Sequence, residues 1–177
     1  TGEMFALTDA TAGANVWTNI GDGTGSVAPT YMSATGGTIT TDGNFKVHTF
    51  NGSGTFTPTI GTVVTVGDTV EYLVIAGGGG GGSLVTTTPG GGGGGAGGML
   101  AASGASLEAG AVYTATVGAG GAKDVDGSDS SLIGSGVSLT AVGGGKGASW
   151  TGSTSAGIGG SGGGGRFNAV AGAAGTV

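Results

Sequence analysis

The first residues that could do chemistry are glycines that directly follow an apolar, strand-like run. Residues 74–82 read VIAGGGGGG and satisfy the G-x-G-x-x-G pattern with which a dinucleotide site begins. The continuation SLVTTTP, residues 83–89, is rich in β-branched residues and closes with Pro89, so it cannot start the helix whose N-terminus would hold a pyrophosphate. Lys146 follows three glycines, but no Ser or Thr comes after it, so a phosphate-binding loop is incomplete too. The sequence therefore predicts no nucleotide site and no cofactor.

A second candidate is the acidic cluster Asp124, Asp126 and Asp129, which surrounds Gly127. Alternating carboxylates around a glycine are typical of a site for a hard cation such as calcium. The distal bidentate glutamate of an EF-hand is missing, and no repeated nonapeptides follow. The pattern favours a polar turn in which Asp and Gly adopt tight dihedral angles, with a calcium site as the open alternative.

The third candidate is His48, the only histidine in a chain without cysteine. A catalytic triad or a zinc site needs more imidazole or thiolate groups than this sequence contains. His48 also falls on the polar positions of the alternating run 45–50, so we expect a solvated strand residue. The sequence predicts that the protein is not an enzyme and has no catalytic residues.

Composition limits the class of protein. Glycine supplies 48 of 177 residues, but there are only three prolines and no strict G-X-Y period, which excludes a collagen triple helix. Hydrophobic residues make up 37% and charged residues 8%, unlike a disordered linker. The net charge is −6 and the cations are scattered (Lys46, Lys123, Lys146, Arg166), which argues against nucleic acid as a partner. The apolar run 70–76 is too short to cross a bilayer, so we expect no membrane insertion.

In the first part of the chain, the elements around these residues have the pattern of β-strands. The run 45–50, the turn 51–54 and the run 55–57 predict a hairpin, and 61–68 and 70–76 predict two more strands. Residues 1–35 form a polar, turn-rich segment, 36–76 a small β-sheet lead-in, and 77–177 a glycine-rich body; we expect the whole to be a fragment of a longer chain. The predicted anchors of the first segment are Phe5, Trp17, Ile20 and Tyr31.

Glycine runs then recur at 77–82, 90–95, 97–98, 143–145, 159–160 and 162–165, with strand-like runs at 113–117 and 137–142 between them. Ordering such runs costs much backbone entropy, which close packing of polyproline-II-type helices can offset because glycine has no Cβ. The predicted fold is mainly β, with short antiparallel β-strands leading into a stacked polyglycine II helix sandwich and almost no α-helix. Glycines expected at close contacts are Gly79, Gly80, Gly92, Gly93 and Gly144.

The succession of strand 70–76, run 77–82, run 90–98, strand 113–121, turn 124–131 and run 143–145 resembles the glycine-rich domain of bacteriophage tail-fibre and adhesin proteins, a polyglycine II sandwich. The resemblance covers residues 35–177. It implies a structural, receptor-binding role at the virion surface or in the extracellular space, with loops that contact a host-cell surface glycan or outer-membrane protein. Other fibre or filament subunits, including copies of itself, are the second kind of partner implied.

The loops that match the family's binding loops are 83–89, 122–131 and 148–156. Within or beside them, the candidate receptor-binding residues are Leu84, Val85, Thr87, Lys123, Asp126, Lys146, Trp150 and Thr151. Trp150 has two interpretations, because an aromatic side chain on a loop can anchor an interface or fold back over the glycine layer.

Two other functions stay open. The T-x-T triplets 38–40, 55–57 and 114–116 resemble those that place threonines on a flat face in ice-binding proteins, although plain β-propensity produces the same pattern. A self-assembling extracellular filament subunit is the third hypothesis. Thermal hysteresis, filaments in the electron microscope and binding to host cells would separate the three.

Overall fold

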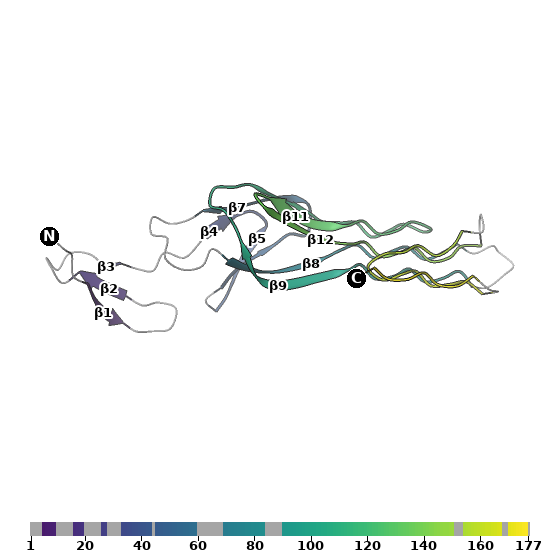
Figure 1. Cartoon of the computed structure of the whole chain (residues 1–177), viewed down its shortest axis with the longest axis horizontal. Coiled ribbons are helices and arrows are strands. Elements are labelled where there is room, and N and C mark those ends of the chain that lie inside the picture. Colours follow the sequence, from purple (N-terminus) through teal and green to yellow (C-terminus); the bar gives the residue numbers. More distant parts are fainter. Residues whose placement is uncertain are drawn as a thin grey trace.

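The computed structural model describes residues 5–9, 16–19, 26–27, 33–43, 45–59, 69–83, 90–150, 154–167 and 170–176. Within these ranges the chain forms twelve β-strands and no α-helix, which confirms the predicted mainly β fold. All strand pairs are antiparallel (Figure 1).

The N-terminal part contains a three-stranded sheet that the sequence did not lead us to expect. Its strands β1 (Phe5–Asp9), β2 (Val16–Asn19) and β3 (Ser26–Val27) pair in chain order. Short alternating runs such as these are compatible with strands even between turn-rich segments. The predicted anchors Ile20 and Tyr31, and the side chains of Phe5 and Trp17, lie outside what the structure describes.

A five-stranded sheet joins distant parts of the chain in the order β12-β11-β10-β7-β4. The strands are β4 (Ser33–Thr35), β7 (Gly54–Thr59), β10 (Tyr113–Thr116), β11 (Ser130–Gly134) and β12 (Val137–Ala141). The predicted strands near 113–117 and 137–142 are confirmed. The boundary that we placed at residue 76 does not divide the sheet, because β7 pairs with β10 across it.

The hairpin predicted from 45–50 and 55–57 is wrong. The strand β6 (Phe45–Thr49) pairs with β5 (Thr38–Asp42), while β7 pairs with β10 and β4. Gly43, with φ of 55°, lies in the short connection between β5 and β6. A short connection containing a positive-φ glycine favours a local hairpin, which leaves β7 free for long-range pairing.

The side chains that β6 turns toward the core also differ from the prediction. His48 is half-buried: its Nδ1 lies 2.8 Å from the carbonyl oxygen of Gly36, and its ring meets Phe56 edge-on at 5.1 Å between centroids. Phe50 points to the same side and packs at the edge of the core, whereas Phe45 is 66% exposed. Since strand side chains alternate, packing Phe50 inward brings His48 with it and turns the apolar positions 45 and 47 outward.

The side-chain core is small and lies in the strand-built part. Phe56 and Tyr113 are directly opposite in the β7–β10 pair, and both pack with Leu107. The buried Tyr113 hydroxyl accepts a hydrogen bond from the N–H of Glu108 at 2.7 Å. This core fixes the base from which the glycine segments extend.

A hairpin of β8 (Thr69–Ile75) and β9 (Met99–Ser106) leads into the glycine-rich body. The strand predicted over 70–76 is confirmed, and the one predicted over 61–68 lies outside the described residues. We number the glycine segments in chain order: the first is 76–83, the second 90–98, the third 118–122, the fourth 125–129, the fifth 143–150, the sixth 154–160, the seventh 161–166 and the eighth 170–176.

These segments are polyglycine II helices, because their hydrogen bonds repeat every three residues. The N–H groups of Ala76, Gly79 and Gly82 donate to the carbonyl oxygens of the second segment at residues 98, 95 and 92, at 3.0, 2.8 and 2.8 Å. Apart from Gly90, no glycine of the segments has a positive φ, so the left-handed helix is present and not its mirror image. At about 3.1 Å per residue, the eight residues of the first segment extend roughly 25 Å.

The fifth segment is the central rod of the bundle. Each of its eight backbone N–H groups, from residue 143 to residue 150, donates a hydrogen bond to a neighbouring segment. The acceptors, in that order, are Asp129 Oδ1, Gly77 O, Ser161 O, Asp126 Oδ1, Gly80 O, Gly164 O, Thr154 O and Ser83 O. Backbone hydrogen bonds between segments therefore take the place of a side-chain core here.

Candidate receptor-binding tip

The ends of the glycine segments remote from the strands form a tip. Ser83 ends the first segment, which starts at β8, and Gly90 begins the second, which returns to β9. The N–H of Trp150 donates to the carbonyl of Ser83 at 3.1 Å, and the N–H of Phe167 donates to the carbonyl of Gly90 at 3.1 Å. The ends of the fifth and seventh segments therefore lie together at the tip (Figure 1).

The side chains of Trp150 and Arg166 meet there, and the backbone of Thr154 lies nearby; we call these three residues the tip cluster. The guanidinium carbon of Arg166 lies 4.1 Å from the centroid of the Trp150 indole, a cation–π contact. Thr154 is adjacent because its carbonyl accepts the N–H of Ser149 at 3.0 Å. The indole Nε1, the threonine Oγ1 and the arginine Nε and Nη1 are buried without a hydrogen-bond partner among the described residues.

Of the predicted receptor-binding residues, only Trp150 belongs to the tip cluster. Leu84, Val85, Thr87 and Thr151 lie outside the described residues. Lys123 is exposed in the turn after the third segment, and Asp126 is exposed in the fourth segment. Lys146 is half-buried in the fifth segment, four residues or about 12 Å along the helix from Trp150.

Sequence reasoning missed Arg166 and Thr154 as members of the site. Arg166 is the only arginine and directly follows the glycine run 162–165, so a lone cation at the end of a glycine run was the available signal. No comparable signal marks Thr154, because only the return of the sixth segment along the fifth places its backbone beside Ser149, the residue before Trp150.

The three aspartates of the acidic cluster accept hydrogen bonds from backbone N–H groups. Asp126 Oδ1 accepts the N–H of Lys146 at 2.7 Å, and Asp129 Oδ1 accepts the N–H of Gly143 at 2.8 Å. These two donors are three residues apart on one side of the fifth segment. Within the described part of the chain, no three His, Asp or Glu side chains gather as a metal site. The carboxylates therefore act as acceptors that complete the bundle.

Asp124 lies in the turn after the third segment and is hydrogen-bonded to Ser83 at the end of the first segment. Its φ of 66° fits the predicted tight turn, and its carboxylate accepts the N–H of Ser83 at 2.6 Å as well as the Ser83 hydroxyl. The Ser83 hydroxyl is the main cause that lowers the pKa of Asp124; the Ser83 N–H, the side chain of Ser149 and the charge of Lys123 add to it, while desolvation opposes it.

Four of the five predicted structural glycines make close backbone contacts. A Cβ added to them would overlap a carbonyl oxygen of a neighbouring segment; they are Gly79, Gly80, Gly92 and Gly144. The prediction for Gly93 is wrong, because an added Cβ would meet no atom within 4 Å. In a helix with three residues per turn, Gly93 shares an outward row with the exposed residue Ala96.

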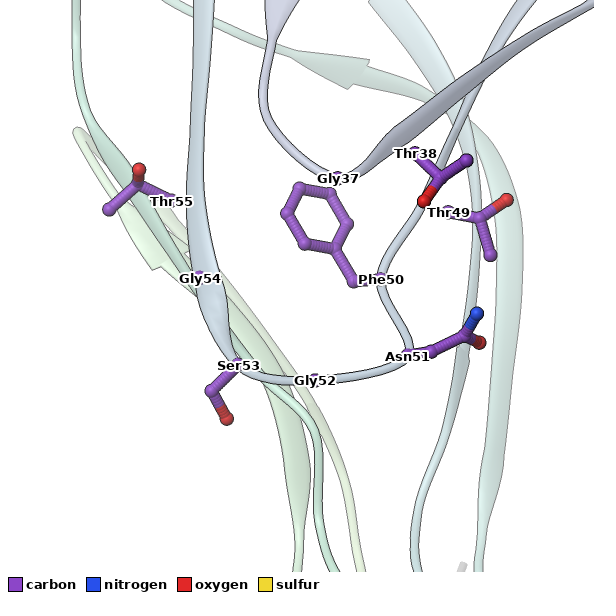
Figure 2. Close-up of a pocket in the computed structure, with 9 residues that line it drawn as sticks. All are labelled: Gly37, Thr38, Thr49, Phe50, Asn51, Gly52, Ser53, Gly54 and Thr55. Carbon is purple, nitrogen blue, oxygen red and sulfur yellow. The ribbon is translucent and has the colours of Figure 1, made fainter.

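A pocket of about 290 Å³ lies away from the tip, between the start of β5, the end of β6 and the start of β7. Figure 2 shows the ring of Phe50 in it, together with Thr38, Thr49 and Thr55. No ionisable side chain lines this pocket, so it offers shape without acid–base chemistry. No helix among the described residues is long and apolar enough to span a membrane.

The fold defines a class: an all-β protein in which a strand-built base carries a bundle of polyglycine II helices. A family model described as a glycine-rich domain matches residues 50–176, well over half of the chain, and the chain belongs to this family. The match includes β7 to β12 and all eight glycine segments. No curated protein and no solved structure matches the chain.

Proposed function

We propose that this protein is a tail-fibre or adhesin component, or another structural protein of a virion, which attaches to a host-cell surface glycan or outer-membrane protein. Its place would be the virion surface or the extracellular space. The observation that carries the proposal is the tip cluster: an indole and a guanidinium group are in contact at the far end of a bundle that is built mostly from glycine backbone.

The rest of the bundle supports this assignment of recognition to the tip. Glycine helices supply shape and stiffness but little chemical variety, whereas indole and guanidinium groups are enriched at the centres of binding patches. The central segment has all eight N–H groups bonded, which holds the tip at a fixed distance from the base. We propose no catalytic role, since the single histidine uses Nδ1 on the Gly36 carbonyl and packs on Phe56.

Cell binding of the purified protein tests the proposal. Labelled protein is titrated onto candidate host cells, and Trp150→Ala is compared with Phe45→Ala, which removes an exposed aromatic ring on β6. Loss of a central aromatic anchor costs on the order of 2 kcal/mol, so Trp150→Ala should weaken attachment about 30-fold or more. Equal binding by both variants, together with a large fall in melting temperature for Trp150→Ala alone, would show that the indole only covers the glycine layer.

Contacts with other subunits are a second part of the proposal. Ile75 and Met99 are paired across the β8–β9 hairpin, and Leu73 lies on the same face; all three are more than half exposed. An exposed apolar face of this kind is typical of an interaction surface. Analytical ultracentrifugation of the wild type and of Leu73→Ser would test this surface, and we expect assembly in the wild type alone. The filament hypothesis predicts the same assembly in the absence of host cells.

Ice binding is the alternative that one observation favours. Thr55 and Thr114 are opposite each other in the β7–β10 pair, and Thr116, Ser131 and Thr140 form the next row of the same face. The threonines of this set are exposed, at an interstrand spacing of about 4.8 Å. Thermal hysteresis that disappears in Thr114→Lys, with host-cell binding absent, would favour this function over attachment.

A further inference from the structure

We propose that the tip cluster recognises an anionic saccharide, with the Arg166 guanidinium paired to a carboxylate, sulfate or phosphate group of the sugar. This inference rests on the proposed attachment function, which names the surface but not its chemistry. It assigns the ligand class of the site: an acidic surface polysaccharide and not a neutral one.

The first argument is the polarity of the unpartnered groups. The indole Nε1 of Trp150 can only donate, the guanidinium nitrogens of Arg166 can only donate, and the Thr154 hydroxyl can donate as well. Buried donors without acceptors are costly, since each loses its hydrogen bonds to water. A ligand rich in acceptor oxygens is the chemical complement of this set.

The second argument is charge. No ion pair neutralises Arg166 among the described residues, in a chain whose net charge is −6. The cation–π contact with Trp150 occupies the face of the guanidinium. Stacking of this kind leaves in-plane N–H groups, which match the oxygens of a carboxylate, sulfate or phosphate in bidentate geometry. Because Nε and Nη1 are buried in the ligand-free structure, the inference requires the tip to open around them when the saccharide binds.

The third argument is the number of donor groups. The cluster holds one cation, one indole N–H and one hydroxyl, which suits a single acidic sugar unit with neighbouring hydroxyl groups. Repetition of that unit along a polysaccharide would add avidity when several copies of the protein attach together. An acidic protein surface is the competing ligand, and the test includes it.

The experiment measures binding of the full chain to immobilised polysaccharides at low and physiological salt. Polygalacturonate supplies carboxylates, dextran sulfate supplies sulfates, a phosphodiester-linked capsular polysaccharide supplies phosphates, and unmodified dextran is the neutral control. We expect binding to at least one acidic polymer, weakened by salt, and none to dextran. Equal binding to dextran and to the acidic polymers would overturn the proposal, as would failure to bind any acidic polymer.

Variants locate the site. Arg166→Gln should lower affinity at least tenfold, and Arg166→Lys should lower it less because charge remains but bidentate pairing is lost. Lys46→Gln, which removes the same charge from β6, should bind as the wild type does. Thr154→Val, similar in volume, provides a second variant if Arg166→Gln melts early, and it should also weaken binding. An equal loss for Lys46→Gln, or no loss for any tip variant, would refute the assignment.

Cell binding separates this inference from the function on which it rests. If Arg166→Gln attaches to host cells as well as the wild type does, or if protease treatment of the cells abolishes attachment while acidic polysaccharide does not compete, the saccharide inference fails and attachment stands. If acidic polysaccharide binds through Arg166 but no host cell is bound, the inference stands and the attachment function fails.

Discussion

Gly80 packs against the carbonyl group of Ala122 so closely that a Cβ on Gly80 would overlap its oxygen. The next residue, Gly81, has 3.7 Å between the same imagined Cβ and the Gly92 oxygen, an ordinary van der Waals contact. Neighbouring glycines in one run therefore have opposite tolerance for a side chain, because a three-residue turn aims each of them at a different neighbour.

Gly80→Ala should destabilise the bundle by about 2 kcal/mol or more, because the third and first segments must separate to admit the methyl group. Gly81→Ala is the matched control and should stay within about 1 kcal/mol of the wild type. Chemical denaturation of both variants measures the difference. Equal destabilisation by the two substitutions would contradict the close packing of Gly80 on Ala122.

Gly92 and Gly93 form a second such pair in the second segment. Gly92→Ala would place its Cβ onto the carbonyl oxygen of Gly164 and should lower the melting temperature. Gly93→Ala faces open space and has no positive φ, so it should raise stability by about 0.4–1 kcal/mol through the entropy of the unfolded chain. Scanning calorimetry checks the opposite signs; a loss of stability for Gly93→Ala would show that its outward position is wrong.

Asp126 completes the hydrogen bonding of the central segment through the N–H of Lys146. Asp126→Ala removes that acceptor and should cost about 0.5–1.5 kcal/mol, whereas Asp126→Asn keeps an oxygen in place and should cost less. Denaturant melts with and without calcium measure this. Strong stabilisation of the wild type by calcium, lost in Asp126→Asn, would instead support the metal interpretation of the acidic cluster.

The lowered pKa of Asp124 makes part of the stability depend on pH. Because the folded pKa lies below the unfolded value, this contribution is present above about pH 4 and is lost as the pH falls through the folded pKa. Asp124→Asn, which tolerates the positive φ, should show a smaller fall in melting temperature between pH 6 and pH 2.5 than the wild type does. Identical pH profiles would exclude the linkage.

A substitution at Tyr113 tests how the strand-built base of the molecule is stabilised. Tyr113→Phe leaves the N–H of Glu108 without its acceptor in a buried setting and should cost about 1–3 kcal/mol. Because the phenyl ring still fills the core, the far-ultraviolet circular dichroism at 25 °C should not change. A neutral result in thermal unfolding would mean that water replaces the hydroxyl.

Local sequence was sufficient to predict several features. The apolar run 70–76 predicted β8. The alternating runs 113–117 and 137–142 predicted β10 and β12, because residues in a half-buried strand alternate between two environments whatever their partner is. The glycine runs predicted polyglycine II segments, since few other conformations offset the entropy that glycine loses on ordering.

The tertiary structure decided which strands pair and which way individual residues face. The sequence did not show that β6 would pair with β5, that His48 would face the core with Phe50, or that Gly93 would point outward, because each depends on which surface a neighbouring segment occupies. Arg166 and Trp150 are 16 residues apart in the printed sequence and meet only because the fifth and seventh segments run parallel, hydrogen-bonded from residue 145 to 161 and from 148 to 164. Packing of backbone on backbone sets that register, and an amino-acid pattern made mostly of glycine carries little information about it.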